Sequence, residues 1–191
     1  MNRGKGRRAL LEKAKKIRYL LLDVDGVMTN GTLYFDESGK EVKGFSIYDG
    51  HGIKLLKDAD IGVGIISGRT SPVVAWRAGD LKIADVHQGV RNKLSAYEMI
   101  LKKYRLNDES VAYIGDDLID LPLLRRVGFP IAVPNAMDEV KKEVDWVTKR
   151  RGGEGAVREV IDFILSAQTQ EKKKGPASFA SAREGREKEG R

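Results

Sequence analysis

One stretch of the chain indicates both its fold and its reactive centre: Tyr19-Leu20-Leu21-Leu22-Asp23-Val24-Asp25-Gly26-Val27-Met28-Thr29. An apolar run that is closed by a glycine, here Gly26, is typical of a buried strand in an α/β sheet. Asp23 and Asp25 are two residues apart, so on an extended chain their side chains point to the same side. Ligands of open α/β sheets bind beyond the carboxyl ends of such strands. The stretch therefore predicts a buried strand that presents two carboxylates to a ligand.

Two carboxylates so close together repel each other unless a cation or a hydrogen-bond network holds them. A hard divalent metal ion does this with oxygen ligands alone. The alternative is a plain surface turn, because Asp and Gly are ordinary turn residues. Turn statistics do not explain why acidic residues should end a buried apolar run, so we favour the metal site.

The composition is that of a globular protein. The chain has 191 residues, of which 41% are hydrophobic, enough for one domain with a sizeable core. It has no cysteine, which excludes disulfides and thiolate metal sites. No basic region joins an apolar signal core, and long apolar runs are missing. We therefore expect a cytoplasmic protein that does not enter the membrane.

The formal net charge of +7 is located mainly at the two ends of the chain. Residues 1–18 hold eight Lys or Arg against one Glu, and residues 171–191 hold seven against four. The remaining body is mildly acidic. Basic terminal arms are more often solvated tails than recognition surfaces, so we expect no nucleic-acid partner. A nucleic-acid-binding phosphatase remains an alternative that depends on the arms alone.

The periodicity predicts alternating strands and helices. Residues 31–46 alternate around a Glu-Ser-Gly turn and predict a small β-hairpin after the first strand. Helices are expected over residues 8–17, 54–58, 71–78, 92–104, 118–127, 137–143 and 155–167, and further strands over residues 61–67, 83–87, 111–114, 129–133 and 144–148. This order predicts parallel βαβ units in a doubly wound, Rossmann-like parallel sheet.

We expect three regions: a basic N-terminal arm or helix over residues 1–16, the α/β domain over 17–168, and a charged, disordered tail over 169–191. The chain between the first two strands of the sheet holds only the hairpin and a short helix. It leaves no room for a separate cap domain over the site.

Three further segments carry polar groups at element ends. Ser67-Gly68-Arg69 follows an apolar strand and suits an oxyanion, although Ser-Gly is also a common turn. Lys93 stands at the expected start of a helix, where a lysine is slightly unfavourable and usually solvated. The strand over 111–114 ends in Gly115-Asp116-Asp117-Leu118-Ile119-Asp120.

Together with Asp23 and Asp25, these segments resemble the four motifs of the haloacid dehalogenase superfamily, in the same order. The resemblance implies that Asp23 attacks phosphorus and that Asp25 transfers protons. It also implies that Ser67 and Lys93 bind the phosphate. A magnesium ion, Mg²⁺, would be bound by the Asp23 and Asp116 carboxylates and the main-chain carbonyl of Asp25. Asp117 and Asp120 would be supporting or helix-capping groups.

Over roughly residues 17–168 the chain also resembles the 3-deoxy-D-manno-octulosonate 8-phosphate phosphatase family of that superfamily. The matching stretches are residues 22–27, 49–53, 66–69, 89–93, 115–120 and 152–159. The resemblance implies a capless enzyme of lipopolysaccharide synthesis, a sugar acid phosphate as substrate, and a homotetramer whose hairpins form a central barrel. The substrate contacts that it implies are Asp25, Ser46, Ile47, Tyr48, Asp49, Gly50, Lys54, Arg69, Arg77 and Lys93.

Several alternatives remain open at this point. Another sugar acid phosphate, of the sialic-acid type, could be the substrate, because related domains act in such pathways. A catalytically idle tetramerisation module is a second alternative, but it commonly lacks part of the catalytic set, which is complete here. Arg77 could simply face solvent on its helix. Lys54 stands where many relatives carry Arg, and Glu154 makes the Gly-rich segment acidic where relatives are often basic.

Overall fold

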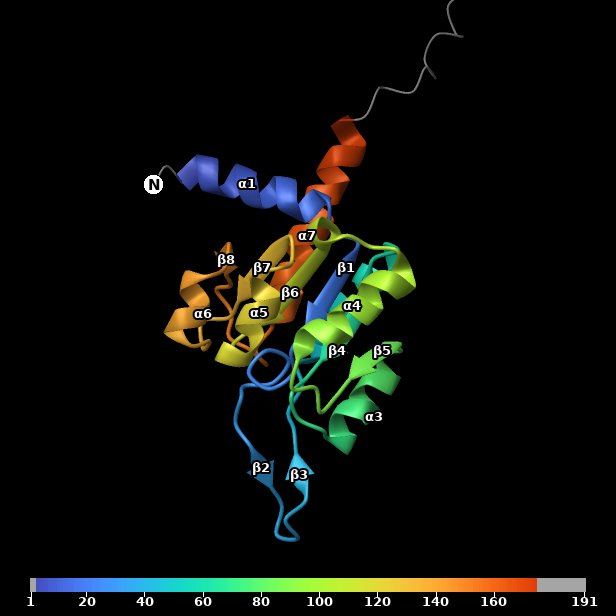
Figure 1. The fold of residues 1–191 in the computed structure, drawn as a ribbon, viewed down its shortest axis with the longest axis vertical. Coiled ribbons are helices and arrows are strands. Elements are labelled where there is room, and N and C mark those ends of the chain that lie inside the picture. The colour runs from blue at the N-terminus through green and yellow to red at the C-terminus, as the bar shows by residue number, and fades with distance from the viewer. Residues whose placement is uncertain (1–2, 175–191) are drawn as a thin grey trace, which may run out of the picture.

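A parallel sheet of six strands forms the centre of the molecule (Figure 1). The structure is a computed structural model that describes residues 3–174. The strands are β1 (Tyr19–Leu22), β4 (Gly62–Ile66), β5 (Asp85–His87), β6 (Val111–Gly115), β7 (Phe129–Ala132) and β8 (Trp146–Val147). They lie in the order β5-β4-β1-β6-β7-β8, and all neighbours are parallel. The predicted doubly wound parallel sheet is confirmed.

Strand β1 lies between β4 and β6, where the direction in which the sheet grows reverses. Such a switch point is where open α/β sheets bind ligands, outside the carboxyl ends of the strands. Leu20, Leu21 and Leu22 are fully buried, as both faces of the sheet are covered by helices. The apolar run that identified this strand is therefore a consequence of its central position.

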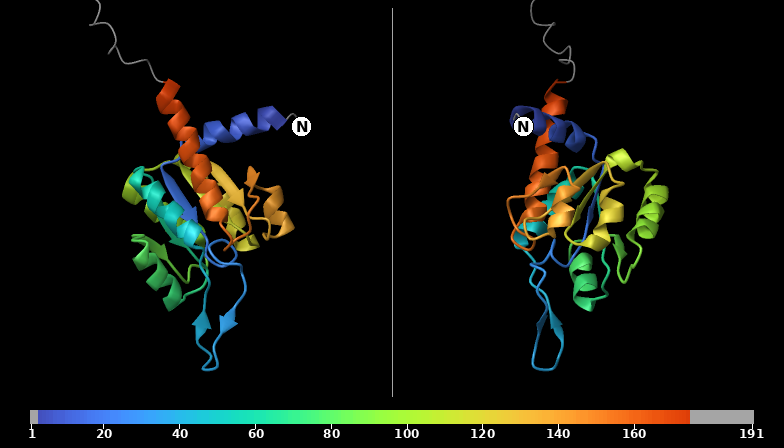
Figure 2. Two further views of the ribbon diagram at one scale, coloured as in Figure 1. Left: turned by 180° about the vertical axis from the view of Figure 1, so that it is seen from behind. Right: turned by 60° about the vertical axis from the view of Figure 1, so that its left-hand side comes forward.

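Helices cover both faces of the sheet (Figures 1 and 2). On one face lie α2 (Ile47–Asp58) and α7 (Ala156–Lys174), and on the other α4 (Lys93–Tyr104) and α5 (Leu121–Leu124). The sequence also forms α1 (Arg3–Lys15), which packs against α7, as well as α3 (Pro72–Asp80) and α6 (Asp138–Lys142). Between residues 3 and 174, no helix combines the length and the apolar character that crossing a membrane requires.

The predicted hairpin is formed by β2 (Tyr34–Phe35) and β3 (Glu41–Val42), which pair antiparallel and project from the end of the molecule opposite α1 (Figure 1). Asp36 holds its turn, because the carboxylate accepts hydrogen bonds from the backbone N–H groups of Ser38 and Lys40, both at 2.9 Å. Between β1 and β4, the described chain contains this hairpin and α2. No separate domain is inserted there, in agreement with the capless architecture.

The prediction for α2 was wrong at its start: the helix begins at Ile47, not at residue 54. The substrate contacts implied for residues 46–50 therefore lie at the N-terminal cap and in the first turn of this helix. Ser46 caps the helix with its side chain. The helix contains two glycines, Gly50 and Gly52, and both lie close to side chains of neighbouring helices. A Cβ on Gly50 would lie 2.3 Å from Arg77 Nη2, and one on Gly52 would lie 2.8 Å from Arg158 Cδ.

Three other helices differ from the prediction in their boundaries. Helix α1 runs from Arg3 to Lys15, whereas it was expected over residues 8–17. The helix expected over residues 118–127 is split into a 3₁₀ turn (Leu118–Asp120) and the short α5, with Pro122 near the start of α5. Helix α7 continues to Lys174, beyond the boundary expected at residue 169. Near that boundary Gln168 Nε2 donates to the carbonyl oxygen of Ile17, 2.8 Å away, which ties the helix to the chain before β1. The rest of the predicted tail, residues 175–191, lies outside the described residues.

Candidate active site

The chain turns sharply after β1 and presents Asp23 at the carboxyl end of the strand. The N–H groups of Val27, Met28 and Thr29 all donate to the carbonyl oxygen of Val24 and close this turn. Gly26 has a φ of +90°, and a Cβ at this position would lie 1.9 Å from Asp116 Oδ2. Only glycine fits both constraints. The glycine after the two aspartates thus allows the ends of β1 and β6 to approach each other.

Lys93, the first residue of α4, points into the protein and is 3% exposed. Its Nζ atom lies 3.1 Å from Asp23 Oδ1 and 2.5 Å from Asp120 Oδ1, and it donates to the hydroxyl of Tyr113 at 3.0 Å. Burial alone would lower the pKa of Lys93, but the carboxylates of Asp23 and Asp120 raise it. The ammonium group is therefore a fixed positive charge beside Asp23. The alternative of a solvated surface lysine is excluded.

Three acidic residues converge beside this ammonium group. One carboxylate oxygen from each of Asp23, Asp116 and Asp120 lies within 4.8 Å of the others. Burial and the neighbouring carboxylates together raise the pKa of Asp23 to about 6 and that of Asp116 to about 8, against the opposing effect of Lys93. Oδ1 of Asp116 is buried and has no hydrogen-bond partner among the described residues. A cation would relieve this repulsion and satisfy this oxygen.

Asp120 differs from the other two acids because both of its oxygens already accept hydrogen bonds. Oδ1 accepts from Lys93 and from Tyr113 at 2.7 Å, and Oδ2 accepts from the backbone N–H groups of Asp116 and Asp117. Asp117 caps the following 3₁₀ turn. The supporting and capping roles expected for Asp117 and Asp120 agree with these contacts. The oxygens left for a cation belong to Asp23 and Asp116.

Ser67 and Arg69 follow β4, next to the end of β1. Ser67 is 2% exposed, its N–H donates to the carbonyl of His87, and its hydroxyl accepts from the N–H of Arg69 at 3.4 Å. The hydroxyl proton of Ser67 is left to be donated elsewhere. The Arg69 side chain is 44% exposed, and its Nη1 lies 3.5 Å from Asp25 Oδ2. The structure thus brings Ser67, Arg69 and Asp25 to the same edge of the sheet.

The Asp25 carboxylate contacts the hairpin and does not belong to the cluster of three acids. It forms an ion pair with Lys43, whose side chain is only 2% exposed. Lys43 in turn contacts Glu41 at 3.3 Å. Sequence reasoning missed Glu41 and Lys43, because charged residues on a hairpin are usually solvated. Because the Asp25 carboxylate pairs with Lys43, the main-chain carbonyl of Asp25 is the group of this residue that could bind a metal ion.

The segment predicted to contact the substrate forms the first turn of α2. Ile47 and Tyr48 are exposed, at 76% and 61%, and Lys54 is exposed further along the helix. The Asp49 side chain is buried instead: Oδ1 accepts a hydrogen bond of 2.8 Å from the N–H of Arg158, in the first turn of α7. Burial raises the pKa of Asp49 to about 6. The carboxylate of Asp49 thus anchors α2 to α7.

Arg77 on α3 lies against this first turn rather than facing solvent. Its Nη1 donates to Asp80 at 2.6 Å and Nη2 donates to the carbonyl of Ser46 at 3.5 Å. The guanidinium carbon lies 5.9 Å from the centre of the Phe45 ring. Nε is buried without a partner among the described residues. Arg77 therefore holds the start of α2 and keeps one donor group unused.

The Gly-rich segment before α7 packs directly on the turn after β1. Asn135 connects the two: its Nδ2 donates to Gly26 O and its Oδ1 accepts from Gly152 N, both at 2.8 Å. A Cβ on Gly152 would lie 1.8 Å from Gly26 O. Gly153 N also donates to Val27 O at 3.0 Å. Asn135 carries no sequence signal, since its partners lie 109 and 17 residues away.

The chain is similar to known phosphatases over most of its length. A family model described as haloacid dehalogenase-like hydrolase matches residues 71–161. The 3-deoxy-D-manno-octulosonate 8-phosphate phosphatase of Escherichia coli strain K12 is 45% identical over 159 residues, which cover 83% of this chain and 85% of that protein.

Solved structures agree with this similarity. The crystal structure of the phosphatase of that name from Yersinia pestis has a TM-score of 0.83 and 44% identity, covering 85% of this chain and 88% of the other. The enzyme from Moraxella catarrhalis, solved in complex with a magnesium ion, a phosphate ion and a KDO molecule, has a TM-score of 0.83 and 40% identity, covering 87% and 95%. The chain belongs to the 3-deoxy-D-manno-octulosonate 8-phosphate phosphatase family of the haloacid dehalogenase-like hydrolases.

Proposed function

We propose that this protein hydrolyses 3-deoxy-D-manno-octulosonate 8-phosphate to 3-deoxy-D-manno-octulosonate and phosphate, with Mg²⁺ as cofactor, in lipopolysaccharide biosynthesis. The observation that carries the proposal is the buried pair of Asp23 and Lys93, 3.1 Å apart, beside the unpartnered oxygen of Asp116. Phosphoryl transfer requires a nucleophile in line with the leaving group, positive charge around the phosphate oxygens and an acid for the leaving oxygen. The identity of the substrate is inferred from the family to which the chain belongs.

Asp23 is the nucleophile of the proposed reaction. As one of its oxygens bonds to phosphorus, the bond from phosphorus to the sugar oxygen breaks, and Asp25 gives its proton to that oxygen. The sugar leaves with a neutral hydroxyl group, and the phosphoryl group stays on Asp23. Asp25, now a carboxylate, takes a proton from the water that attacks phosphorus. This second displacement releases phosphate and restores Asp23.

Lys93 and Ser67 bind the phosphate in this proposal. The Lys93 ammonium neutralises charge on both the nucleophile and the phosphate, and it is held in place by Asp120 and Tyr113. The Ser67 hydroxyl donates to a phosphate oxygen. Both groups are almost fully buried, which strengthens their electrostatic effect compared with water.

The carboxylates of Asp23 and Asp116 and the main-chain carbonyl of Asp25 would hold the magnesium ion. The residues fit such a cation, because Oδ1 of Asp116 is buried without a partner among the described residues and because burial and like charges raise the pKa of both acids. When bound, the ion offsets the charge of the phosphate oxygens as the nucleophile approaches.

The carboxylate of the substrate needs a cationic partner at the mouth of the site. Arg69 is the strongest candidate, because it is partly exposed and lies beside Asp25, and a guanidinium group can bind a carboxylate through two hydrogen bonds. Lys54, Arg77 and the turn of residues 46–50 complete the proposed contacts. The spare Nε of Arg77 supports its place in this set.

We further propose a homotetramer in which the hairpins of the four subunits pack together. Four apolar side chains of the hairpin are between 46% and 60% exposed, which favours a protein interface. They are Leu33, Tyr34, Phe35 and Val42. Action in the cytoplasm, without nucleic-acid or membrane partners, stays a prediction from the sequence.

The test is phosphate release, with and without Mg²⁺, from a panel of substrates. The panel contains the eight-carbon sugar acid phosphate, its nine-carbon relatives of the sialic-acid type and a 5′-phosphorylated oligonucleotide. We expect a strong, Mg²⁺-dependent preference for the eight-carbon acid. Preference for a nine-carbon acid would change the assigned substrate to a sugar acid phosphate of the sialic-acid type. No release from any compound would favour the idle tetramerisation module.

A further inference from the structure

We propose that Glu41 and Lys43, at the base of the hairpin, are positioning residues that hold the Asp25 carboxylate for proton transfer to the leaving oxygen. The inference rests on the function proposed above and assigns the hairpin a part in the reaction itself. It follows from a closed network of four charges between the hairpin and the catalytic edge of the sheet.

The network alternates positive and negative groups. Lys43 Nζ pairs with Asp25 Oδ1 and lies 3.3 Å from Glu41 Oε1. Arg69 closes the ring, with Nη2 at 2.8 Å from Glu41 Oε1 and Nη1 at 3.5 Å from Asp25 Oδ2. Each carboxylate therefore contacts both cations, and each cation contacts both carboxylates. The two oxygens of Asp25 have different partners, which fixes the plane of its carboxylate.

The burial of the Lys43 side chain indicates that its position in the network is fixed. Its side chain is 2% exposed, and that of Glu41 is 14% exposed. An ammonium group removed from water is destabilising unless opposite charges and hydrogen bonds compensate for the lost solvation. A lysine that only kept a hairpin soluble would extend into solvent. Lys43 instead points back to Asp25, 18 residues earlier in the chain.

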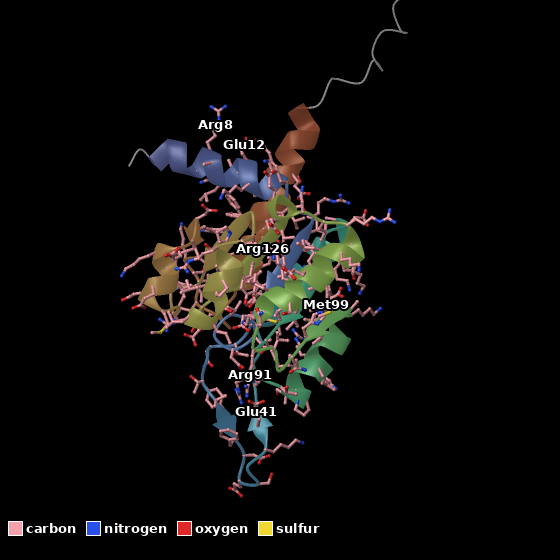
Figure 3. The ribbon with its side chains drawn as sticks, viewed as in Figure 1. Arg8, Glu12, Glu41, Arg91, Met99 and Arg126 are labelled. Carbon is pink, nitrogen blue, oxygen red and sulfur yellow. The ribbon has the colours of Figure 1, made fainter. Side chains whose placement is uncertain are left out.

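Glu41 attaches this end of the hairpin to the body of the protein. It accepts hydrogen bonds from Arg69, after β4, and from the hydroxyl of Ser71, which precedes α3. The hydrogen bond from Ser71 is the largest effect that lowers the pKa of Glu41, with Lys43 and Arg69 adding to it. Figure 3 labels Glu41 on the hairpin, below the body of the protein. Lys43 therefore extends from an anchored strand.

The two cations differ in how firmly they are held. Arg69 is 44% exposed and its contact with Asp25 Oδ2 is long, whereas Lys43 is buried against Oδ1. When the anionic substrate draws Arg69 away, Oδ2 loses its cationic partner and can carry the proton that Asp25 gives to the leaving oxygen, while Lys43 still orients Asp25 through Oδ1. This division of roles assigns substrate binding to Arg69 and the orientation of Asp25 to Lys43.

Kinetics with two kinds of leaving group test the proposal. The sugar phosphate releases an alcohol and needs a proton donor, whereas para-nitrophenyl phosphate releases a stable phenolate and does not. Because kcat/KM reports the steps up to departure of the leaving group, it isolates the proton transfer from the later hydrolysis. The variants are Lys43→Met, Lys43→Arg and, as a matched control, Lys40→Met at an exposed position of the same hairpin.

We expect Lys43→Met to lower kcat/KM for the sugar phosphate by about 30- to 100-fold and that for para-nitrophenyl phosphate by less than about threefold. Lys43→Arg should recover part of the loss, and Lys40→Met should resemble the wild type. Glu41→Gln should follow Lys43→Met in direction with a smaller loss on the sugar phosphate.

Equal losses on both substrates would overturn the positioning role, because a collapsed hairpin or a weakened phosphate site affects both. Unchanged activity on both would overturn it as well. Failure of the function proposed above is recognised separately: the wild-type enzyme would then cleave para-nitrophenyl phosphate but not the sugar acid phosphate. In that case the variants are compared on another alkyl phosphate that the wild type cleaves, instead of the sugar acid phosphate.

Discussion

Asp23 combines 6% exposure with an ammonium group 3.1 Å away, which is the environment expected of the proposed nucleophile beside the proposed phosphate-binding lysine. Asp23→Asn keeps the shape of the side chain and removes the attacking carboxylate. We expect kcat to fall by at least about a thousandfold, since an amide oxygen is a poor nucleophile. Phosphate release under saturating Mg²⁺ measures this.

The matched control for this experiment is Asp58→Asn, an exposed position near the end of α2. It should keep wild-type turnover. The thermal unfolding temperature of Asp23→Asn should not fall, because the substitution removes one of three mutually repelling acids. Substantial activity in well-folded Asp23→Asn would remove Asp23 from the role of nucleophile.

Metal binding is testable without turnover. A ligand that binds only the folded state stabilises it, by about 2.7 kcal/mol at a concentration of 100 times Kd. We expect Mg²⁺ to raise the unfolding temperature of the wild type and to lose most of this effect in Asp116→Asn. Asp25→Asn should keep the effect, because its carboxylate faces Lys43 and Arg69. A lost Mg²⁺ effect in Asp25→Asn would contradict the main-chain ligand.

At the residue scale, sequence reasoning found groups that stand at the ends of apolar strands or at the start of a helix. Asp23, Asp116 and Lys93 are of this kind, and the structure brings them together. Lys43 and Asn135 could not be found in this way. Their roles come from partners far away in the chain, which local patterns do not encode.

At the scale of elements, Asp49 connects two helices that share one face of the sheet. Its burial raises its pKa to about 6 from an ordinary value of 3.8. As pH rises through about 4 to 6, the unfolded chain releases this proton while the folded protein retains it. The free energy of unfolding therefore decreases across this range and levels off above it. Since one pKa unit is worth about 1.4 kcal/mol, the contribution of Asp49 is at most about 3 kcal/mol.

Asp49→Asn tests this contribution, because the amide oxygen can still accept the hydrogen bond from the N–H of Arg158. Urea unfolding at several pH values between 4 and 7 should show a smaller pH-dependent loss of stability in Asp49→Asn than in the wild type. Asp58→Asn, on the same helix, should keep the wild-type pH dependence. An identical pH profile for Asp49→Asn and the wild type would show that Asp49 titrates normally.

Local propensity failed for α2 because the reasons for its two glycines lie in other elements. Gly50 adjoins Arg77 of α3, and Gly52 adjoins Arg158 of α7. Helix propensity counts each glycine as unfavourable by about 1 kcal/mol and cannot include such packing. Strand β1, in contrast, was predicted correctly because its burial on both faces is written in its own residues.

At the scale of the whole molecule, the hairpin has two chemically distinct parts. Glu41 and Lys43 form its charged base at the site, and Leu33 and Phe35 belong to its exposed apolar surface. Association and chemistry should therefore be separable by mutation. The double variant Leu33→Gln/Phe35→Gln introduces polar amides that an apolar interface disfavours, and it leaves the charged base unchanged.

Light scattering of the wild type should give about four times the chain mass of 21.2 kDa, and the double variant should shift towards a single chain. Trp76→Gln is the matched control. It also replaces a large exposed apolar side chain, at 73% exposure, but one that lies on α3 and not on the hairpin. An unchanged mass of the double variant would exclude the hairpin as the interface. If the dissociated variant still hydrolyses para-nitrophenyl phosphate but has a raised KM for the sugar phosphate, the neighbouring subunit covers the substrate and the chemistry belongs to one chain.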